Sequence, residues 1–109
     1  GRGKDLVISG GFNVYPKEVE SEIDALPGVV ESAVIGVAHP DFGEGVTAVV
    51  VRAKGASLSE KDIAGALEGQ LAQFKQPKKI FFVDDLPRNT MGKVQKNLLR
   101  DQYKTIYGG

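Results

Sequence analysis

Residues 46–52 read VTAVVVR, and residues 29–37 read VVESAVIGV. Both runs are rich in β-branched side chains, which suit the pleated and partly buried surface of a sheet. Residues 39–45, which contain one proline and two glycines, bridge the two runs. We therefore expect two antiparallel strands joined by this segment. The letters GEGVTA at positions 43–48 satisfy the dinucleotide-binding pattern, but they lead into a strand rather than out of a strand into a helix, so we interpret them as a turn.

The segments before this strand pair predict a hairpin and a helix. Residues 5–9 and 12–14 are short β-like runs, and Gly10 and Gly11 between them permit the positive φ angles of a tight turn. Residues 16–26 begin with a proline, which suits the first turn of a helix. Their apolar side chains recur at helical spacing, and the acidic side chains take the other face: Glu18, Glu20, Glu22 and Asp24.

The segments after the strand pair predict a second helix, a third strand and a third helix. Ser59 is followed three residues later by Asp62, which resembles a helix capping box, and an apolar stripe continues to Leu71. Residues 79–83 are apolar enough for a strand, and residues 84–92 form a loop. Apolar side chains at helical spacing then predict a helix over residues 94–106.

This order of elements predicts an α+β fold, with an N-terminal β-hairpin followed by a small mixed β-sheet and three packed helices. The 109 residues are enough for one domain, which we interpret as part of a longer protein because a motif begins at Gly1.

The composition excludes several classes of function. Fourteen basic and fourteen acidic side chains cancel, so no global field attracts the chain to nucleic acid or to an anionic membrane. The absence of cysteine excludes disulfides, thiolate nucleophiles and cysteine-based zinc sites, and it fits a cytoplasmic protein. His39 is the only histidine, which leaves too few ligands for a histidine-based metal site or triad. No apolar run approaches the ~20 residues that a membrane span needs.

Residues 87–93 read PRNTMGK and place a lysine directly after a glycine, between an apolar strand and a helix. Gly92 gives the backbone freedom beside Lys93. From the residues alone, Lys93 is either a solvated surface lysine or a group that can approach an anionic reaction centre. Lys96, one helical turn further on, is the competing candidate.

Three segments carry a family resemblance: GRGKDLVISGG at residues 1–11, GGFNVYPKEVE at residues 10–20, and PRNTMGK at residues 87–93. Together they resemble the mobile C-terminal domain of the adenylate-forming enzymes, in particular the acyl-CoA synthetases, and among these the chain looks most like bacterial malonyl-CoA synthetases. The resemblance covers residues 1–109. It implies that a large N-terminal domain, which carries the acyl pocket and most ligands of ATP and Mg²⁺, lies outside this chain.

The resemblance also implies an activity and a set of site residues. Acid, ATP and CoA would give acyl-CoA, AMP and pyrophosphate through an acyl-adenylate. Lys93 and Gly92 would be catalytic, Arg2 and Lys93 would bind nucleotide, and Lys4 and Asp5 would form a hinge within residues 1–5. Seven residues would line the CoA site: Ser9, Gly10, Gly11, Phe42, Phe74, Lys75 and Lys78. No metal ligand falls in this chain.

Two of these residue types have a second interpretation. Phe74 could instead close the base of a helix, and Lys75 and Lys78 could be solvated charges. Gln76 stands where the family often has a basic residue, which removes one expected phosphate contact.

The partners implied are the protein's own N-terminal domain, a carboxylic acid such as malonate, and a lysine acetyltransferase that would act on Lys93. The isolated chain is expected to be inactive. Other adenylate-forming ligases remain as alternatives: fatty or aryl acyl-CoA ligases and the adenylation domains of peptide synthetases. A non-catalytic α+β module that binds RNA or protein is a third alternative.

Overall fold

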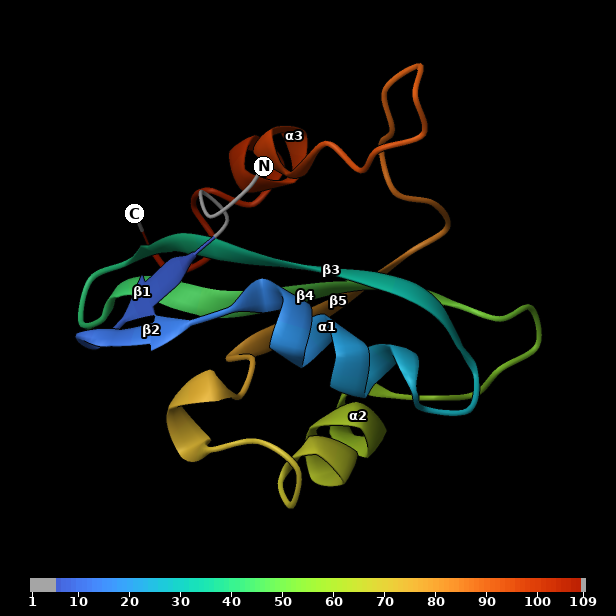
Figure 1. Ribbon diagram of the computed structural model, residues 1–109, viewed down its shortest axis with the longest axis horizontal. Helices are drawn as coiled ribbons and strands as arrows, with labels where there is room; N and C mark the ends of the chain where they lie inside the picture. The colour runs from blue at the N-terminus through green and yellow to red at the C-terminus, as the bar shows by residue number, and fades with distance from the viewer. Residues whose placement is uncertain (1–5, 109) are drawn as a thin grey trace.

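Strand β4 (Gly43–Arg52) is the central strand of the sheet. It pairs antiparallel with β3 (Val29–His39) and parallel with β5 (Lys79–Val83). The computed structural model describes residues 6–108, and Figure 1 shows the arrangement. The remaining elements are β1 (Val7–Ser9), β2 (Phe12–Val14), α1 (Pro16–Asp24), α2 (Glu60–Leu67), the short 3₁₀ helix η2 (Gln73–Lys75) and α3 (Lys96–Gln102).

The N-terminal hairpin is attached to the end of this sheet. β1 and β2 pair antiparallel, and Ser9 of β1 pairs with Gly43 at the start of β4. Gly10 and Gly11 have φ angles of 59° and 86°, so the turn requires the conformations that glycine adopts most readily. The expected α+β fold with a hairpin and a mixed sheet is confirmed.

Helices cover both faces of the sheet, with α1 and α2 on one side and α3 on the other (Figure 1). Successive side chains of β4 point to opposite faces. Val46, Ala48 and Val50 therefore pack in the core beneath α1 and α2. Val49 and Val51 belong to a second core that includes Leu99 of α3. Burial on both faces explains why β4 reads as a nearly continuous apolar run.

The first core is completed by α1 and α2, whose starts follow the expected signals. Pro16 occupies the first turn of α1, and Ser59 and Asp62 form the expected capping box of α2. The Ser59 Oγ accepts a hydrogen bond from the Asp62 backbone N–H, and the Asp62 carboxylate accepts one from the Ser59 N–H. The two groups thus satisfy backbone donors that a helix start leaves unpaired.

Two expected boundaries are wrong. The last helix runs from Lys96 to Gln102 rather than over residues 94–106, because Val94 is held in a β-bridge with Arg88 and the chain turns after Tyr103. Residues 43–45, which we interpreted as a turn, belong to β4, and the turn itself is limited to residues 40–42. Backbone pairing thus decides the start of α3 and the start of β4.

The segment after α3 returns to the sheet through Tyr107. Its hydroxyl shares a 2.8 Å hydrogen bond with the fully buried Thr47, whose hydroxyl also donates to the Gly45 carbonyl at 3.1 Å. The ring lies over Gly45, where a Cβ would approach the ring Cε2 to 2.8 Å. Burial raises the pKa of Tyr107, so the hydroxyl remains protonated at neutral pH.

We expect Tyr107→Phe to lower the free energy of unfolding by about 1 kcal/mol, because Thr47 loses one of its hydrogen-bond partners in a buried place. Urea denaturation of the chain measures this change. Tyr103→Phe is the matched control, since its ring stacks on Phe81 with centroids 4.6 Å apart and its hydroxyl bonds no described residue. An equal loss in both variants would contradict a specific role for the Tyr107 hydroxyl.

Candidate functional site

The candidate catalytic lysine lies on a loop that projects from the body of the domain between β5 and α3 (Figure 1). The two ends of the loop are anchored in the second core by the buried Leu86 and the partly buried Val94. Next to these anchors, the Gln95 N–H donates to the Pro87 carbonyl at 2.8 Å and closes the base of the loop. The loop is therefore a narrow hairpin whose two ends are anchored in the core.

The tip of this loop is shaped by Asn89. Its side-chain oxygen accepts hydrogen bonds from the N–H groups of Met91 and Lys93, at 2.9 and 3.0 Å. The Asn89 N–H donates to the Lys93 carbonyl, and the Gly92 N–H donates to the Asn89 carbonyl, both at 3.0 Å. Gly92 has a φ of 84°, so the backbone freedom expected for it is used in the structure.

The side chain of Lys93 is exposed. Among residues 6–108, the structure gives its ammonium no ion pair or hydrogen bond. The backbone on both sides of Lys93 is held, while the side chain is available to a ligand.

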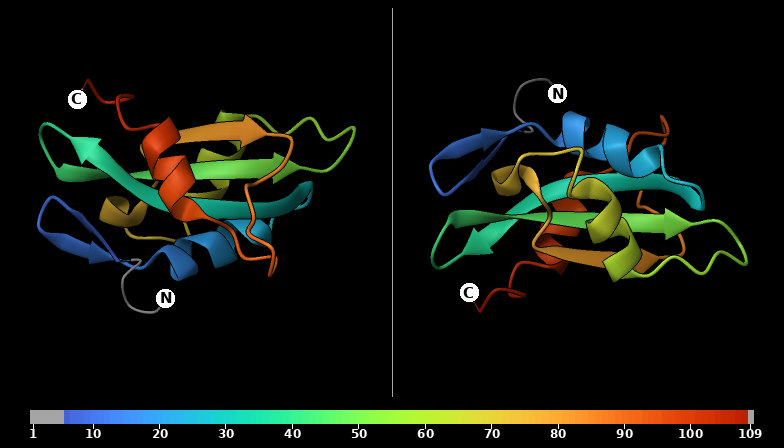
Figure 2. Two further views of the ribbon diagram at one scale, coloured as in Figure 1. Left: turned by 90° about the horizontal axis from the view of Figure 1, so that it is seen from above. Right: turned by 90° about the horizontal axis from the view of Figure 1, so that it is seen from below.

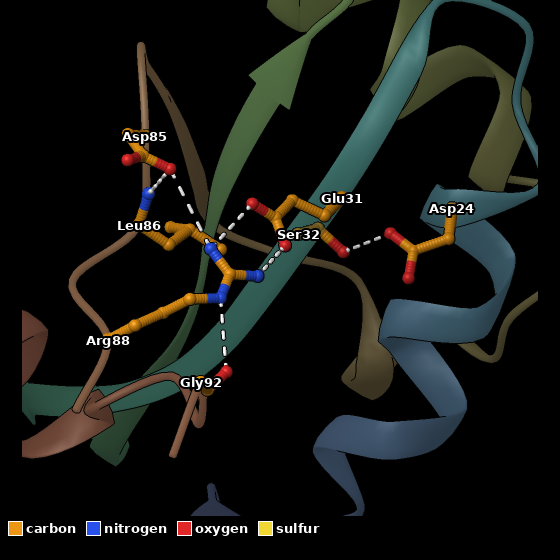
Figure 3. Close-up of polar contacts among 7 residues, drawn as sticks. All are labelled: Asp24, Glu31, Ser32, Asp85, Leu86, Arg88 and Gly92. Carbon is orange, nitrogen blue, oxygen red and sulfur yellow. Dashed lines mark hydrogen bonds and ion pairs between the residues drawn. The ribbon is translucent and has the colours of Figure 1, made fainter. Parts of the chain in front are cut away.

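Arg88 ties the same loop to the sheet (Figure 3). Its guanidinium forms two hydrogen bonds with the Glu31 carboxylate on β3, one of them from Nη1 at 3.1 Å and the other from Nη2. Its Nε donates to the Gly92 carbonyl at 3.2 Å. The hydrogen bond to Glu31 raises the pKa of Arg88 above its ordinary value, so the guanidinium is charged at neutral pH.

The competing lysine, Lys96, is engaged within the domain. Its ammonium lies 2.7 Å from a carboxylate oxygen of Glu20, and both side chains are largely buried, at 17% and 15% exposed. The same Glu20 oxygen accepts a hydrogen bond from the Val34 N–H of β3 at 2.8 Å. From the sequence, Glu20 belongs to the acidic face of its helix. In the structure β3 is an edge strand, so the Val34 N–H has no strand partner on this side and needs another acceptor, which Glu20 provides.

The expected CoA residues gather at the opposite end of the domain, around the β1–β2 hairpin. The Gly10 N–H donates to the Phe42 carbonyl at 2.8 Å, and a Cβ on Gly10 would approach the Phe42 ring to 3.1 Å. The Lys78 ammonium lies 3.8 Å from the centre of the Phe42 ring. Ser9 is buried, at 4% exposed, whereas Gly10 and Gly11 are exposed at the turn.

The other aromatic side chain of this group is covered by a residue that sequence reasoning did not include. Phe74 stacks on Phe12 with ring centroids 4.6 Å apart, and both rings remain partly exposed. Phe74 is therefore not a buried plug at the base of a helix. The ammonium of the adjacent Lys75 lies 2.9 Å from the Glu18 carboxylate and 5.7 Å from the Phe74 ring. Gln76 donates to the carbonyls of Leu67 and Leu71, so it caps the end of α2 instead of facing a ligand.

The two candidate surfaces face different directions. Figures 1 and 2 show the β1–β2 hairpin at one end of the sheet and the Lys93 loop at the other. The expected hinge and nucleotide residues Arg2, Lys4 and Asp5 lie outside the described residues.

Residues 6–108 offer neither a cluster of metal ligands nor a membrane-spanning helix. They contain no group of three or more histidine, cysteine, aspartate or glutamate side chains that could hold a metal ion. No helix in this range has the length and apolar character required to cross a membrane.

The sequence of the chain matches a known family. Residues 18–93, well over half of the chain, match the model of the AMP-binding enzyme C-terminal domain. The chain belongs to this family. The matched residues include most of α1 and the loop as far as Lys93.

Similar proteins are CoA ligases and related synthetases. The chain is 52% identical over 103 residues to 3-[(3aS,4S,7aS)-7a-methyl-1,5-dioxo-octahydro-1H-inden-4-yl]propanoyl:CoA ligase of Rhodococcus jostii, covering 94% of this chain and 20% of that protein. It is 48% identical over 102 residues to the long-chain-fatty-acid–CoA ligase FadD13 of Mycobacterium tuberculosis, again covering 94% and 20%. Crystalline apo MatB from Rhodopseudomonas palustris superposes with a TM-score of 0.96 at 78% identity, covering 98% of this chain and 21% of MatB. The chain thus spans about a fifth of the length of these proteins.

The two lysines should differ in their effect on stability. Lys96→Ala should lower the free energy of unfolding by about 1–3 kcal/mol, because it leaves a largely buried Glu20 without its charged partner. Lys93→Ala should change it by less than about 0.5 kcal/mol, since Lys93 is exposed. Urea denaturation of both variants measures the difference, and a larger loss for Lys93→Ala would contradict the description of its side chain as available.

Proposed function

We propose that this domain is the C-terminal part of an AMP-forming acyl-CoA synthetase and that Lys93 is its catalytic residue. The observation that carries the proposal is the combination at Lys93 of a fixed backbone with an exposed ammonium that pairs with no described residue. The other lysine near the loop, Lys96, is bound to Glu20 and is not available in the same way.

The first half-reaction needs such a group. A carboxylate oxygen attacks the α-phosphorus of ATP, the bond from that phosphorus to pyrophosphate breaks, and the acyl-adenylate forms. Two anions approach each other, and negative charge increases on the phosphoryl oxygens. A lysine ammonium placed beside both would stabilise this transition state more than the separated substrates. We propose that ATP and Mg²⁺ bind chiefly to the N-terminal domain, with Arg2 and Lys93 reaching the nucleotide from this one.

The second half-reaction needs the other end of the domain. The CoA sulfur attacks the acyl carbon, the bond from that carbon to the AMP oxygen breaks, and the thiol proton passes to solvent. Glycine at positions 10 and 11 leaves space for a narrow pantetheine chain. Phe42, Phe74, Lys75 and Lys78, which lie beside that turn, are the proposed contacts for the adenine and phosphates of CoA.

A rotation of the domain links the two halves in this proposal. One rigid orientation cannot bring Lys93 and the Gly10–Gly11 turn to the same reaction centre, because they lie at opposite ends of the sheet (Figure 2). A hinge at Lys4 and Asp5, just before β1, would allow the domain to present each end in turn.

We propose malonate, or methylmalonate, as the acid. The support is the 78% identity to MatB, a malonyl-CoA synthetase, against 52% and 48% for the two CoA ligases of other acids. Another adenylate-forming ligase is the second candidate, and a fatty or aryl acid would then be the substrate. An RNA-binding sheet is disfavoured, since helices cover both faces of this one and leave no open face on which bases could stack.

The intact synthetase that contains this domain should form acyl-CoA from malonate, with release of AMP. The experiment compares kcat/KM for malonate, methylmalonate, a long-chain fatty acid and an aryl acid by following AMP and thioester formation. Malonate or methylmalonate should give the highest value. A preference for the fatty or aryl acid would replace the substrate, and absence of AMP formation with any acid would overturn the enzyme class.

Lys93→Ala in the intact synthetase should slow adenylation by ~10²–10³, the effect of removing one preorganised electrostatic group. Pyrophosphate exchange measures this step. Thioester formation from a supplied acyl-adenylate should change far less, because the domain would then have turned Lys93 away. The same thioester assay reports on the proposed CoA residues through the KM for CoA.

Lys96→Ala is the matched control, assayed at a temperature at which the variant is folded, and it should retain both half-reactions. Lys4→Pro, which would lock φ at the proposed hinge, should retain adenylation and lose thioester formation. The assignment is wrong if Lys96→Ala is the more damaging change or if Lys93→Ala slows both steps alike. Equal loss of both steps in Lys4→Pro would contradict the hinge.

A further inference from the structure

We propose that Arg88, which Glu31 of β3 holds in place, is a positioning residue for Lys93 and acts through the backbone carbonyl of Gly92. The inference rests on the proposed role of Lys93 in adenylation, and it adds the contacts that orient the lysine side chain. It assigns a function to an ion pair, Glu31 with Arg88, whose partners are separated by 57 residues in the sequence.

The Gly92–Lys93 peptide group is held at both of its polar atoms. Its carbonyl oxygen accepts a hydrogen bond from the Arg88 Nε at 3.2 Å, and its N–H donates to the Asn89 side chain at 3.0 Å. A peptide group is planar, so two contacts on opposite sides fix the orientation of the plane. The direction in which the Lys93 side chain leaves the backbone follows from that plane.

The two contacts constrain different features of the loop. Asn89 belongs to the loop, so its hydrogen bonds set the internal shape of the tip and would move with it. Arg88 also contacts the carboxylate of Glu31, a residue in a strand that is paired along its length with β4 (Figure 3). The Arg88 contact therefore fixes the tip relative to the sheet.

An arginine suits this task for geometric reasons. The guanidinium is planar and rigid, so two parallel bonds from Nη1 and Nη2 to one carboxylate also fix where Nε points. Gly92 is the residue that needs such support, because it has no Cβ and occupies a φ of 84°. A lysine at position 88 could pair with Glu31 but could not hold the Gly92 carbonyl at the same time in this geometry.

A purely structural role for this ion pair is the competing explanation. The Arg88 and Glu31 side chains are 36% and 25% exposed, and partly exposed pairs add little to stability. A structural role would also affect both half-reactions to the same degree. The two explanations therefore differ in which step a variant slows.

The experiment is a double-mutant cycle in the intact synthetase, with pyrophosphate exchange and thioester formation measured separately. Arg88→Ala should lower the kcat of adenylation by about 10–100-fold, the scale for a catalytic group displaced by about 1 Å. The KM for ATP and the rate of the thioester step should each change by less than about threefold if only the orientation of Lys93 is lost. Arg88→Lys should lose nearly as much, and in the Lys93→Ala background Arg88→Ala should cause no further loss.

Lys104→Ala is the control for loss of a surface cation, since Lys104 forms an exposed pair with Asp101 at 3.3 Å. It should leave both steps unchanged, and an effect equal to that of Arg88→Ala would overturn the proposal. Additive losses with Lys93→Ala, equal losses in both steps, or full activity of Arg88→Lys would also overturn it.

Failure of the proposed function gives a different result. If Lys93→Ala alone leaves adenylation intact, the catalytic assignment and the positioning role fall together. If Lys93→Ala slows adenylation but Arg88→Ala does not, only the positioning role is wrong.

Discussion

The burial of β4 on both faces, combined with hydrogen bonding on both of its edges, is the constraint on which the rest of the domain depends. Val46, Ala48 and Val50 support α1 and α2, while Val49 and Val51 support α3. A strand in this position cannot shift its register by one residue, because every side chain would move to the opposite core. The positions of β3 and β5 are fixed by pairing with it.

The candidate sites inherit their geometry from those two neighbours. β5 leads into the Lys93 loop, and β3 provides Glu31, which contacts that loop through Arg88. At the other end, Gly43 of β4 pairs with Ser9 and thereby places the hairpin turn. One rigid strand thus separates the two surfaces that the proposed reaction uses in succession, so a rotation of the whole domain could exchange them without any internal rearrangement.

Local signals predicted the parts of the fold that depend on neighbouring residues. The hairpin turn followed from Gly10 and Gly11, the start of α2 from Ser59 and Asp62, and the strands from β-branched runs. The lysine on the loop was recognisable from its motif. The start of the last helix was not, because the bridge between Arg88 and Val94 competes with helical spacing.

Contacts between distant segments left no readable pattern in the sequence. Glu20 lies on an acidic helix face, and only the position of β3 beside that helix shows that its carboxylate is needed inside the domain. Glu31 and Arg88 likewise carry no local mark of their pairing. The motif around Lys93 includes Arg88, but no sequence pattern identifies Glu31, 57 residues away, as its partner.

The acidic face of α1 has a consequence for association between molecules. Glu20 accepts a hydrogen bond from the Val34 N–H, and Asp24 accepts one from the Ser32 hydroxyl at 2.7 Å. Two carboxylates of α1 therefore lie along the side of β3 that lacks a strand partner, and Figure 3 shows the contact of Asp24 with Ser32. An unprotected sheet edge is a template for a strand from another chain. Here an incoming strand would have to displace Glu20 from the Val34 N–H and would meet the charge of Asp24 beside it. A domain that rotates as proposed could thus expose this edge of its sheet without pairing with a strand of another molecule.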